Sequence, residues 1–421
     1  MRGACTEGRL CSRAGRAAAL PERVIDFSSG LDYTPCMKHT FTVTVSRGLE
    51  DILALELRRL GLQKVKPERG TVRFVGPLRD GLRACLWCRT GSRVLLQLAR
   101  FQANDPADVY DALHAIPWED HLDPDGLLWV DFVGTSRDIR HSQYGARLTK
   151  DAIVDRLRTP SGTRPGVDRE DPDVRVHVHL KHSVFTVSID LSGAALHWRT
   201  PRRRMTEAPL KETLAASLLM LMDWPKRAKE GQPLIDPMCG SGTILQEGAA
   251  IAACLPPGRF RNHWGFSRWR GHDPDAWQAL ITEAKAQQVR AKSLVLGFDS
   301  DPEAIAVARY NNRQLGLGNL TIKQRRLSEL RPPADAPPGL MVTNPPYGER
   351  IGDGNLVDLY RTIGDQLRQH MLGYSAGVLA PLGPLSKSVG LRTSQRHILH
   401  NGPLECRFLT FEISTEAPLQ F

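Results

Sequence analysis

The N-terminal part of the chain switches between two hydrophobic periods. Alternation of apolar and polar residues, as in Thr40-Phe-Thr-Val-Thr-Val45, indicates a strand, whereas apolar residues three or four apart indicate a helix. In chain order the pattern predicts strand, helix, strand, helix and strand at 40–45, 48–60, 71–75, 78–88 and 94–98. This order predicts a small α/β unit over residues 38–100.

A second set of helical and alternating patterns follows over residues 101–195. Helices are predicted at 109–116 and 144–158, and strands at 127–133, 174–180 and 184–191. The interval 159–173 is rich in Pro, Gly and Asp, which indicates a loop. Cations gather in the segments before this loop: Arg137, Arg140, Arg147, Lys150, Arg156 and Arg158.

The rest of the chain has the strand and helix alternation of a doubly wound sheet over 224–421. It follows a basic hinge and linker helix over 196–223. Strands are predicted at 234–236, 294–299, 320–322, 340–343 and 375–380, and helices at 243–254, 302–315 and 355–370. Asn401-Gly402 separates two further strands, which is a strong hairpin signal. A parallel sheet closed by a C-terminal antiparallel hairpin is typical of class I methyltransferases.

Residues 1–37 have no clear hydrophobic period and are rich in Arg, Ala and Gly. They lack the long apolar core of a secretory signal. We expect either a disordered extension, a start codon assigned too far upstream, or an Arg-rich tail that contacts RNA.

Composition narrows the class of partner. The chain has 421 residues, 41% of them hydrophobic, and no apolar run long enough to predict a membrane span. Lys and Arg exceed Asp and Glu by 56 − 46 = 10. This excess favours a nucleic-acid partner over a merely solvated basic surface. Eight cysteines are too few for a disulfide scaffold, so a reduced cytoplasmic setting fits and Cys85 and Cys88 are expected to be structural. No metal site is predicted.

The first chemical motif is Asp236-Pro-Met-Cys-Gly-Ser-Gly-Thr243, in which a short strand breaks into a Gly-rich turn before a helix. Such a turn lets a ligand approach backbone N–H groups closely. It matches neither a dinucleotide fingerprint nor a phosphate-binding loop, and the residues around it favour S-adenosylmethionine. The predicted cofactor-binding residues are Asp236, Met238, Cys239, Gly240, Ser241, Gly242, Thr243, Asp299 and Ser300.

Asp299 ends the next predicted strand and has two interpretations. A carboxylate at that place can accept both ribose hydroxyls of a nucleotide cofactor. Alternatively it caps the helix that begins at Pro302, although Asp301 suits that N-cap better. We favour the ribose role.

The second motif, Asn344-Pro-Pro-Tyr347, follows another apolar strand and is the more specific of the two. An exocyclic amine on a base is a poor nucleophile because its lone pair is delocalised into the ring. The Asn344 side-chain oxygen and the Pro345 carbonyl can accept its two hydrogens and direct the lone pair at a methyl sulfonium. Tyr347 can stack on the base. Alternatively Pro345 and Pro346 form only a turn, with Tyr347 in the core.

The two motifs together resemble the THUMP-domain RNA methyltransferases, most closely the bacterial 23S ribosomal RNA guanine-N2 methyltransferase family. The resemblance extends over roughly 38–413. The matching segments outside the two motifs are Ser46–Glu50, Arg140–Gly145, Lys150–Asp155, Asp190–Gly193, Lys211–Ala216, Trp264–Ser267 and Asn401–Leu404.

The resemblance implies a fold and a reaction. A ferredoxin-like domain over 38–100 and a THUMP RNA-binding domain over 101–195 would precede a Rossmann-like catalytic domain over 224–421. Asp236, Gly240, Gly242 and Asp299 would contact S-adenosylmethionine, and 344–347 would hold a guanine in domain V of the 23S RNA. Some members carry a second methyltransferase domain, and we expect the single-methyltransferase form here.

One residue departs from the family pattern. An acid usually follows the third strand of the sheet and can bind the adenine amine of the cofactor. Arg326 stands at that position here, so Ser328 or Glu329 would have to substitute.

Basic residues of the second unit and the hinge are candidates for RNA phosphate contacts rather than merely solvated charges. They are Arg140, Arg147, Lys150, Arg199, Arg202, Arg203 and Arg204. Trp264, Trp269 and Trp277 either pack the segment after the first catalytic helix or stack on unpaired RNA.

Three alternatives to guanine-N2 methylation stay open. Asn-Pro-Pro-Tyr also suits N6-adenine methylation or methylation of a protein glutamine, although the charge and the THUMP-like half argue against a protein. A catalytically inactive RNA-binding assembly factor is a different class, which only Arg326 favours. The substrate is expected to be 23S RNA or its precursor particle.

Overall fold

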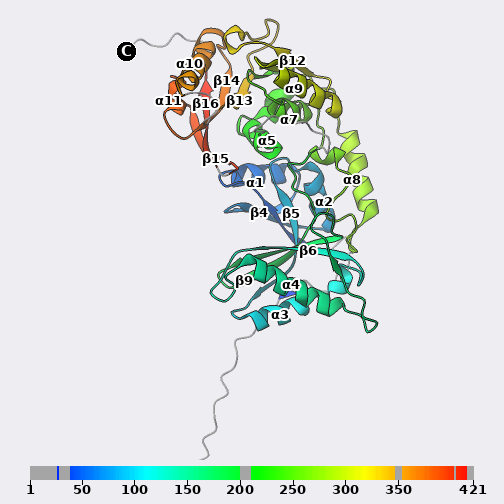
Figure 1. Ribbon diagram of the computed structural model, residues 1–421. Coiled ribbons are helices and arrows are strands. Elements are labelled where there is room, and N and C mark those ends of the chain that lie inside the picture. Colours follow the sequence, from blue (N-terminus) through cyan, green and yellow to red (C-terminus); the bar gives the residue numbers. More distant parts are fainter. Residues whose placement is uncertain (1–25, 28–37, 200–209, 347–352, 403, 415–421) are drawn as a thin grey trace, which may run out of the picture.

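The computed structural model describes residues 26–27, 38–199, 210–346, 353–402 and 404–414, with the side chains of 26–27 and 353–355 excluded. Within these residues the chain forms a nine-stranded and a seven-stranded sheet. Figure 1 shows the seven-stranded sheet and its helices at one end of an elongated molecule and the N-terminal sheet at the other.

The N-terminal elements form a β-α-β-β-α-β unit rather than the predicted β-α-β-α-β order. They are β2 (His39–Thr44), α1 (Glu50–Arg59), β3 (Gln63–Glu68), β4 (Thr71–Gly76), α2 (Leu78–Trp87) and β5 (Arg93–Gln102). Strand β3 was not predicted. It lies at the edge of the sheet, where charged residues and Pro67 are tolerated and no apolar alternation is required.

The second group of elements continues the same sheet. It comprises α3 (Pro106–His114), β6 (Leu127–Val133), α4 (Ser142–Leu157), β7 (Gly166–Val167), β8 (Val174–Lys181) and β9 (Val184–Asp190). The strand order is β3-β4-β2-β5-β9-β8-β6-β7, and β5 pairs antiparallel with both β2 and β9. Strand β5 therefore joins the two units into one continuous hydrogen-bonded layer.

The expected extension over 1–37 lies outside the described residues except for one short strand. Strand β1 (Asp26–Phe27) pairs antiparallel with β5, opposite Arg100 and Ala99. At these two residues the structure differs from the expected disorder.

The C-terminal sheet has the order β12-β11-β10-β13-β14-β16-β15. Its strands are β10 (Leu234–Asp236), β11 (Val295–Asp299), β12 (Leu320–Gln324), β13 (Leu340–Thr343), β14 (Ser375–Pro381), β15 (Gln395–Asn401) and β16 (Leu404–Glu412). The first five positions are parallel, and β16 is antiparallel to both of its neighbours. The predicted parallel sheet with a C-terminal hairpin is confirmed. The order reverses between β10 and β13, which is where ligands bind in open α/β sheets.

Helices cover both faces of this sheet. They are α5 (Glu212–Leu221), α6 (Trp224–Lys229), α7 (Thr243–Ala252), α8 (Pro274–Ala286), α9 (Pro302–Leu315), α10 (Asp353–His370) and α11 (Leu385–Ser388). Successive residues of β10 point to opposite faces: Leu234 belongs to a core shared with the N-terminal sheet, and Ile235 to a second core with Ile363 and Leu367 of α10. Strand β10 is therefore packed on both faces, which fixes the position of its C-terminal end.

The segment between α7 and β11 packs against the N-terminal sheet region. Trp269 Nε1 donates a hydrogen bond to His121 Nδ1 at 3.0 Å, and Arg268 forms an ion pair with Asp171 at 2.9 Å. Trp264 and Trp269 are buried, and Trp277 packs edge-on against Trp264. Of the two interpretations of these tryptophans, packing is confirmed.

One expectation about composition, the structural role of two cysteines, can be checked against the described part of the chain. Cys85 and Cys88 are buried, and burial raises the pKa of each thiol, so their structural role is confirmed. Within the described residues, His, Cys, Asp and Glu side chains do not gather into a metal-binding group, and no helix is long and apolar enough to cross a bilayer.

Candidate active site

The Gly-rich turn connects the end of β10 to the start of α7. Gly240 has φ +52° and Gly242, the N-cap of α7, has φ +85°, both in the left-handed region that favours glycine. A Cβ on Gly242 would also lie 3.0 Å from Gln246 Nε2. The turn therefore needs glycine for its backbone shape, and a Cβ on Gly240 would have no atom within 4 Å, so a ligand can approach the backbone closely there.

Asp299 lies at the end of β11 and holds this turn. The Gly240 N–H donates to Asp299 Oδ2 at 2.9 Å, and the Asp301 N–H donates to Oδ1 at 3.0 Å. Asp301, not Asp299, is the N-cap of α9, because its side chain accepts from the Glu303 N–H at 2.9 Å. Asp299 remains partly exposed, and each carboxylate oxygen has a second lone pair for a ribose hydroxyl.

We expect Asp299→Ala to weaken S-adenosylmethionine binding by ~10- to 100-fold, since hydrogen bonds to a charged group contribute about 1.5–3 kcal/mol. Asp301→Ala, two residues away, is the matched control. It should lower the free energy of unfolding by about 1 kcal/mol through loss of the cap and leave the affinity unchanged. Calorimetric titration of both variants measures the difference. Equal affinities would assign Asp299 a purely structural role.

Asp236 ends β10 and is 1% exposed. The Met238 N–H donates to its Oδ1 at 3.2 Å. Burial raises the pKa of this carboxyl to about 7, against the opposing effects of the Thr343 hydroxyl and the Met238 amide. Cys239 is also buried, and burial raises the pKa of its thiol. Asp236 therefore lies buried at the end of β10, where the Gly-rich turn begins.

The raised pKa of Asp236 predicts a pH dependence of stability. The folded protein keeps a proton on Asp236 up to about pH 7, whereas an unfolded chain releases it near pH ~4. The free energy of unfolding should therefore fall as the pH rises through this window, by at most ~1.4 kcal/mol per pH unit. Asp236→Asn removes this contribution, so denaturation at several pH values should show wild type losing stability relative to the variant. A constant difference between the two proteins would contradict the raised pKa.

Asn344 directly follows β13, the parallel neighbour of β10 on the other side of the topological switch. Its Oδ1 is buried and accepts no hydrogen bond from the described residues. An unsatisfied buried carbonyl oxygen costs about 1–3 kcal/mol, and an N–H donor from a ligand would remove this penalty. Pro345 is buried and Pro346 exposed, while Tyr347 lies outside the described residues.

The strand end where the family usually has an acid is occupied by basic and amide side chains. Gln324, the last residue of β12, donates from Nε2 to the Ser300 carbonyl at 3.0 Å. The Arg326 N–H donates to Glu329 Oε2 at 3.3 Å, so one oxygen of Glu329 already bonds to the backbone. Ser328 and Glu329 are both exposed. The substitute for the missing acid stays a prediction.

The predicted RNA-binding cations lie in different environments. Arg140 and Arg147 are exposed, and Lys150 forms an ion pair with Asp151. Arg199 is only 7% exposed, so the prediction that it contacts RNA phosphates is wrong. Its guanidinium instead donates hydrogen bonds to Glu247 and to three backbone carbonyls. Arg202, Arg203 and Arg204 lie outside the described residues.

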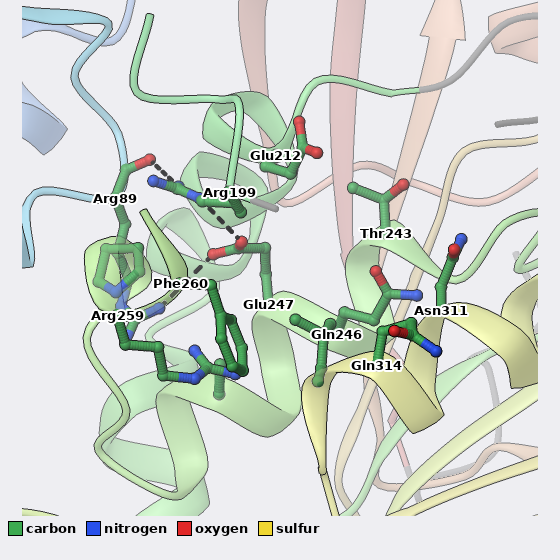
Figure 2. Close-up of a pocket in the computed structure, with 13 residues that line it drawn as sticks. Arg89, Arg199, Glu212, Thr243, Gln246, Glu247, Arg259, Phe260, Asn311 and Gln314 are labelled. Carbon is green, nitrogen blue, oxygen red and sulfur yellow. Dashed lines mark hydrogen bonds and ion pairs between the residues drawn. The ribbon is translucent and has the colours of Figure 1, made fainter. Parts of the chain in front are cut away.

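Sequence reasoning missed the ionic cluster that Arg199 belongs to (Figure 2). Arg199 Nε lies 3.2 Å from Glu247 Oε1, and Arg89 Nη1 lies 3.6 Å from Glu247 Oε2. Arg259, on the same small cavity, stacks its guanidinium over the Phe260 ring at 4.4 Å. The sequence did contain one signal of this cluster, because Glu247 is the only charged residue in the apolar helix α7. The cluster ties the N-terminal sheet region to the helix that begins at the cofactor turn.

The fold and the site define a methyltransferase of the doubly wound class, with an amide and a Gly-rich turn at neighbouring strand ends. The chain belongs to the RMKL-like methyltransferase domain family, which it matches over residues 199–409. Two further matches precede it, to the RlmL ferredoxin-like domain over 40–95 and to the THUMP domain over 103–190. The resemblance noted from the sequence is confirmed.

Known proteins agree with this assignment. The chain is 42% identical over 380 residues to a protein named ribosomal RNA large subunit methyltransferase K/L from Allochromatium vinosum, which is 89% of this chain and 52% of that protein. The chain thus spans about half the length of the curated relatives it matches.

Two solved structures are similar along most of the chain. SMU.472, described as a methyltransferase and complexed with SAH, aligns with a TM-score of 0.80 at 27% identity, over 90% of this chain and 99% of that chain. A protein of Listeria monocytogenes described as an N6-adenine-specific DNA methylase aligns with a TM-score of 0.78 at 29% identity. The alignment covers 89% of this chain and 96% of that chain. These likenesses and the geometry of the turn support S-adenosylmethionine as the cofactor.

Proposed function

We propose that the chain transfers a methyl group from S-adenosylmethionine to the exocyclic N2 amine of a guanine in 23S ribosomal RNA, in domain V by family resemblance. The observation that carries the proposal is the unsatisfied Asn344 Oδ1 at the end of β13. It adjoins the strand that ends in the cofactor turn. A hydrogen-bond acceptor beside a cofactor turn is what an amine substrate requires.

The residues of the chain position the amine rather than ionise it. Asn344 Oδ1 and the Pro345 carbonyl accept the two N–H groups, which orients the nitrogen lone pair and stabilises the positive charge that develops on it. When bound, S-adenosylmethionine supplies an electrophilic methyl group. The reaction forms the nitrogen–carbon bond, breaks the carbon–sulfur bond, and releases one proton from the methylated amine to solvent.

The RNA substrate is inferred from three supports: the THUMP match, the net charge of +10 and the name of the curated relatives. Arg140 and Arg147 are the exposed candidates for phosphate contacts. Free 23S RNA and a precursor particle are both possible carriers of the base, and either would place the protein in the cytoplasm. A base in a helix must be extruded to reach Asn344.

A second candidate is methylation of the N6 amine of adenine. The same pair of acceptors serves that amine, and the Listeria monocytogenes structure bears that description. A catalytically inactive RNA-binding protein is supported only by Arg326 at the usually acidic position.

The deciding experiment is methyl transfer from labelled S-adenosylmethionine to large-subunit RNA from cells lacking the protein, followed by nucleoside analysis. Labelled N2-methylguanosine is the expected result, and labelled N6-methyladenosine would change the base but keep the enzyme. No label in naked RNA or precursor particles, with no cofactor binding by calorimetry, would favour the inactive binding protein.

A further inference from the structure

A second cavity, of about 490 Å³, lies between the N-terminal helices and the catalytic domain. Residues of α1, the end of α2, α5, α6, the end of α7 and the segment 287–292 line it. In Figure 1, α1 lies directly beneath α5, and α2 lies beside α8. Its volume falls within the roughly 300–1,000 Å³ of typical ligand pockets.

This cavity is distinct from the cofactor turn. It is lined by Ile251, Ala252 and Cys254 at the C-terminal end of α7, whereas the turn with Gly242 is at the N-terminal end. Along a helix of this length the two ends are ~14 Å apart at 1.5 Å per residue. A ligand in the cavity therefore does not compete with the cofactor.

Cations dominate the rim of the cavity. Arg59, Lys229, Arg290 and Lys292 line it, with Trp87 as its aromatic wall. The acid in the lining, Glu56, is buried and accepts from the backbone N–H groups of Arg89 and Thr90, at 2.8 and 3.1 Å. The cations therefore retain an excess of positive charge.

Part of this charge has a structural explanation. Arg59 and Lys229 lie in the last turns of α1 and α6, where cations stabilise the helix dipole. Arg59 also pairs with Asp223 at 3.6 Å. Arg290 and Lys292 lie outside any helix, are exposed, and have no ion-pair partner among the described residues. These two cations have no comparable structural role.

The backbone around Arg290 and Lys292 is held at both ends. The Val289 N–H donates to the Ala253 carbonyl at 3.1 Å, and Ser293 Oγ donates to the Ala228 carbonyl at 2.7 Å. Cys254, next to Ala253 in the chain, has φ +52°, a left-handed conformation that is uncommon for residues other than glycine. The two cations are thus presented on an anchored segment that needs little ordering when an anion binds.

We infer that this cavity binds an unpaired strand of the RNA substrate, with phosphates on Arg290 and Lys292 and a base against Trp87. The inference rests on the proposed function, because it assumes an RNA substrate. Charge complementarity selects a polyanion, and an aromatic wall beside cations is the combination that binds single-stranded nucleic acid. The cavity gives the RNA a second anchor at the opposite end of α7 from the cofactor turn.

Cys254 provides a direct footprint, because it is the partly exposed member of the cysteines in the described residues. Its rate of alkylation by iodoacetamide, followed by peptide mass spectrometry, should fall several-fold when large-subunit RNA is added. Unchanged labelling of Cys254 in a complex that is methylated would overturn the inference and leave the proposed function intact. Absence of both RNA binding and methylation would overturn the proposed function as well. A thiol already protected without RNA would show that the cavity is closed before RNA binds and would also overturn the inference.

Charge variants test the phosphate contacts separately. A plot of log affinity for RNA against log salt concentration has a negative slope. Arg290→Gln and Lys292→Gln should each make this slope less steep by about 0.7, the value for one phosphate contact on a single strand. Lys285→Gln, an exposed cation on α8 that does not line the cavity, is the matched control and should leave the slope unchanged. Affinity for S-adenosylmethionine should be the same in all three variants. Slopes equal to that of the control would refute the site.

Discussion

Replacing Asn344 by alanine is expected to lower the rate of methyl transfer by about 10²- to 10³-fold, the usual loss when one preorganised electrostatic contact to the transition state is removed. Asn344 Oδ1 is a buried acceptor without a hydrogen-bond partner among the described residues. The variant loses the acceptor for one amine hydrogen, so the nitrogen lone pair is no longer directed at the methyl group. Single-turnover rates with labelled S-adenosylmethionine measure the effect.

The affinity for S-adenosylmethionine separates this role from a structural one. Asn344 follows β13, whereas the cofactor turn belongs to β10 and α7, so the variant should bind the cofactor almost as wild type does. Asn344→Gln is the matched variant: it keeps the amide and displaces it by one methylene, and misplacement of this size is also expected to slow the reaction. Normal turnover by the alanine variant would refute the amine-holding role.

Glu247→Ala should lower the free energy of unfolding by about 3–5 kcal/mol, the usual result of removing one partner of a buried ion pair. Glu247 is 6% exposed and lies between Arg199 and Arg89, as Figure 2 shows. Without its carboxylate Arg199 and Arg89 remain buried and unneutralised beside the half-buried Arg259. Burial already lowers the pKa of Arg89, and it lowers that of Arg259 to about 10. Chemical denaturation measures the change.

Glu283→Ala is the matched control for this prediction. Glu283 in α8 pairs with Arg79 in α2 and so also links the catalytic and N-terminal parts, but the two side chains are 48% and 39% exposed. A solvent-exposed pair of this kind contributes about 0–1 kcal/mol. If the two variants lost equal stability, burial of the cluster would not be the source of its effect.

Much of the fold follows from local pattern. The strands of the catalytic sheet alternate with amphipathic helices, and Asn401-Gly402 marks the hairpin that makes β16 antiparallel. Besides the very short β1, β7 and α11, the elements that pattern missed are β3, α6 and α8. Strand β3 is a charged edge strand, α6 has only six residues, and α8 buries little more than Leu280 and Ala284. Each lacks the broad apolar face that a period-based prediction detects.

In the candidate site, too, one part was predictable from the sequence and another part was not. Its two motifs are contiguous in sequence, and each was recognisable from the residues that its turn requires. Arg199 was assigned to the RNA surface because a cation in a basic segment is ordinarily exposed. Its burial depends on Glu247 and on the carbonyls of Cys88 and Arg89, which the fold brings together from separate parts of the chain.

The sequence by itself therefore determined the class of protein, the Gly-rich turn and the Asn-Pro-Pro segment, because backbone conformation and side-chain chemistry at these places depend on adjacent residues. Only the tertiary structure decided which charges are buried and which carboxylate holds the turn. It also decided that Arg290 and Lys292 share a cavity with Trp87. Burial and long-range pairing depend on residues far apart in the chain, and the spacing of residues along the sequence does not encode them in any local pattern.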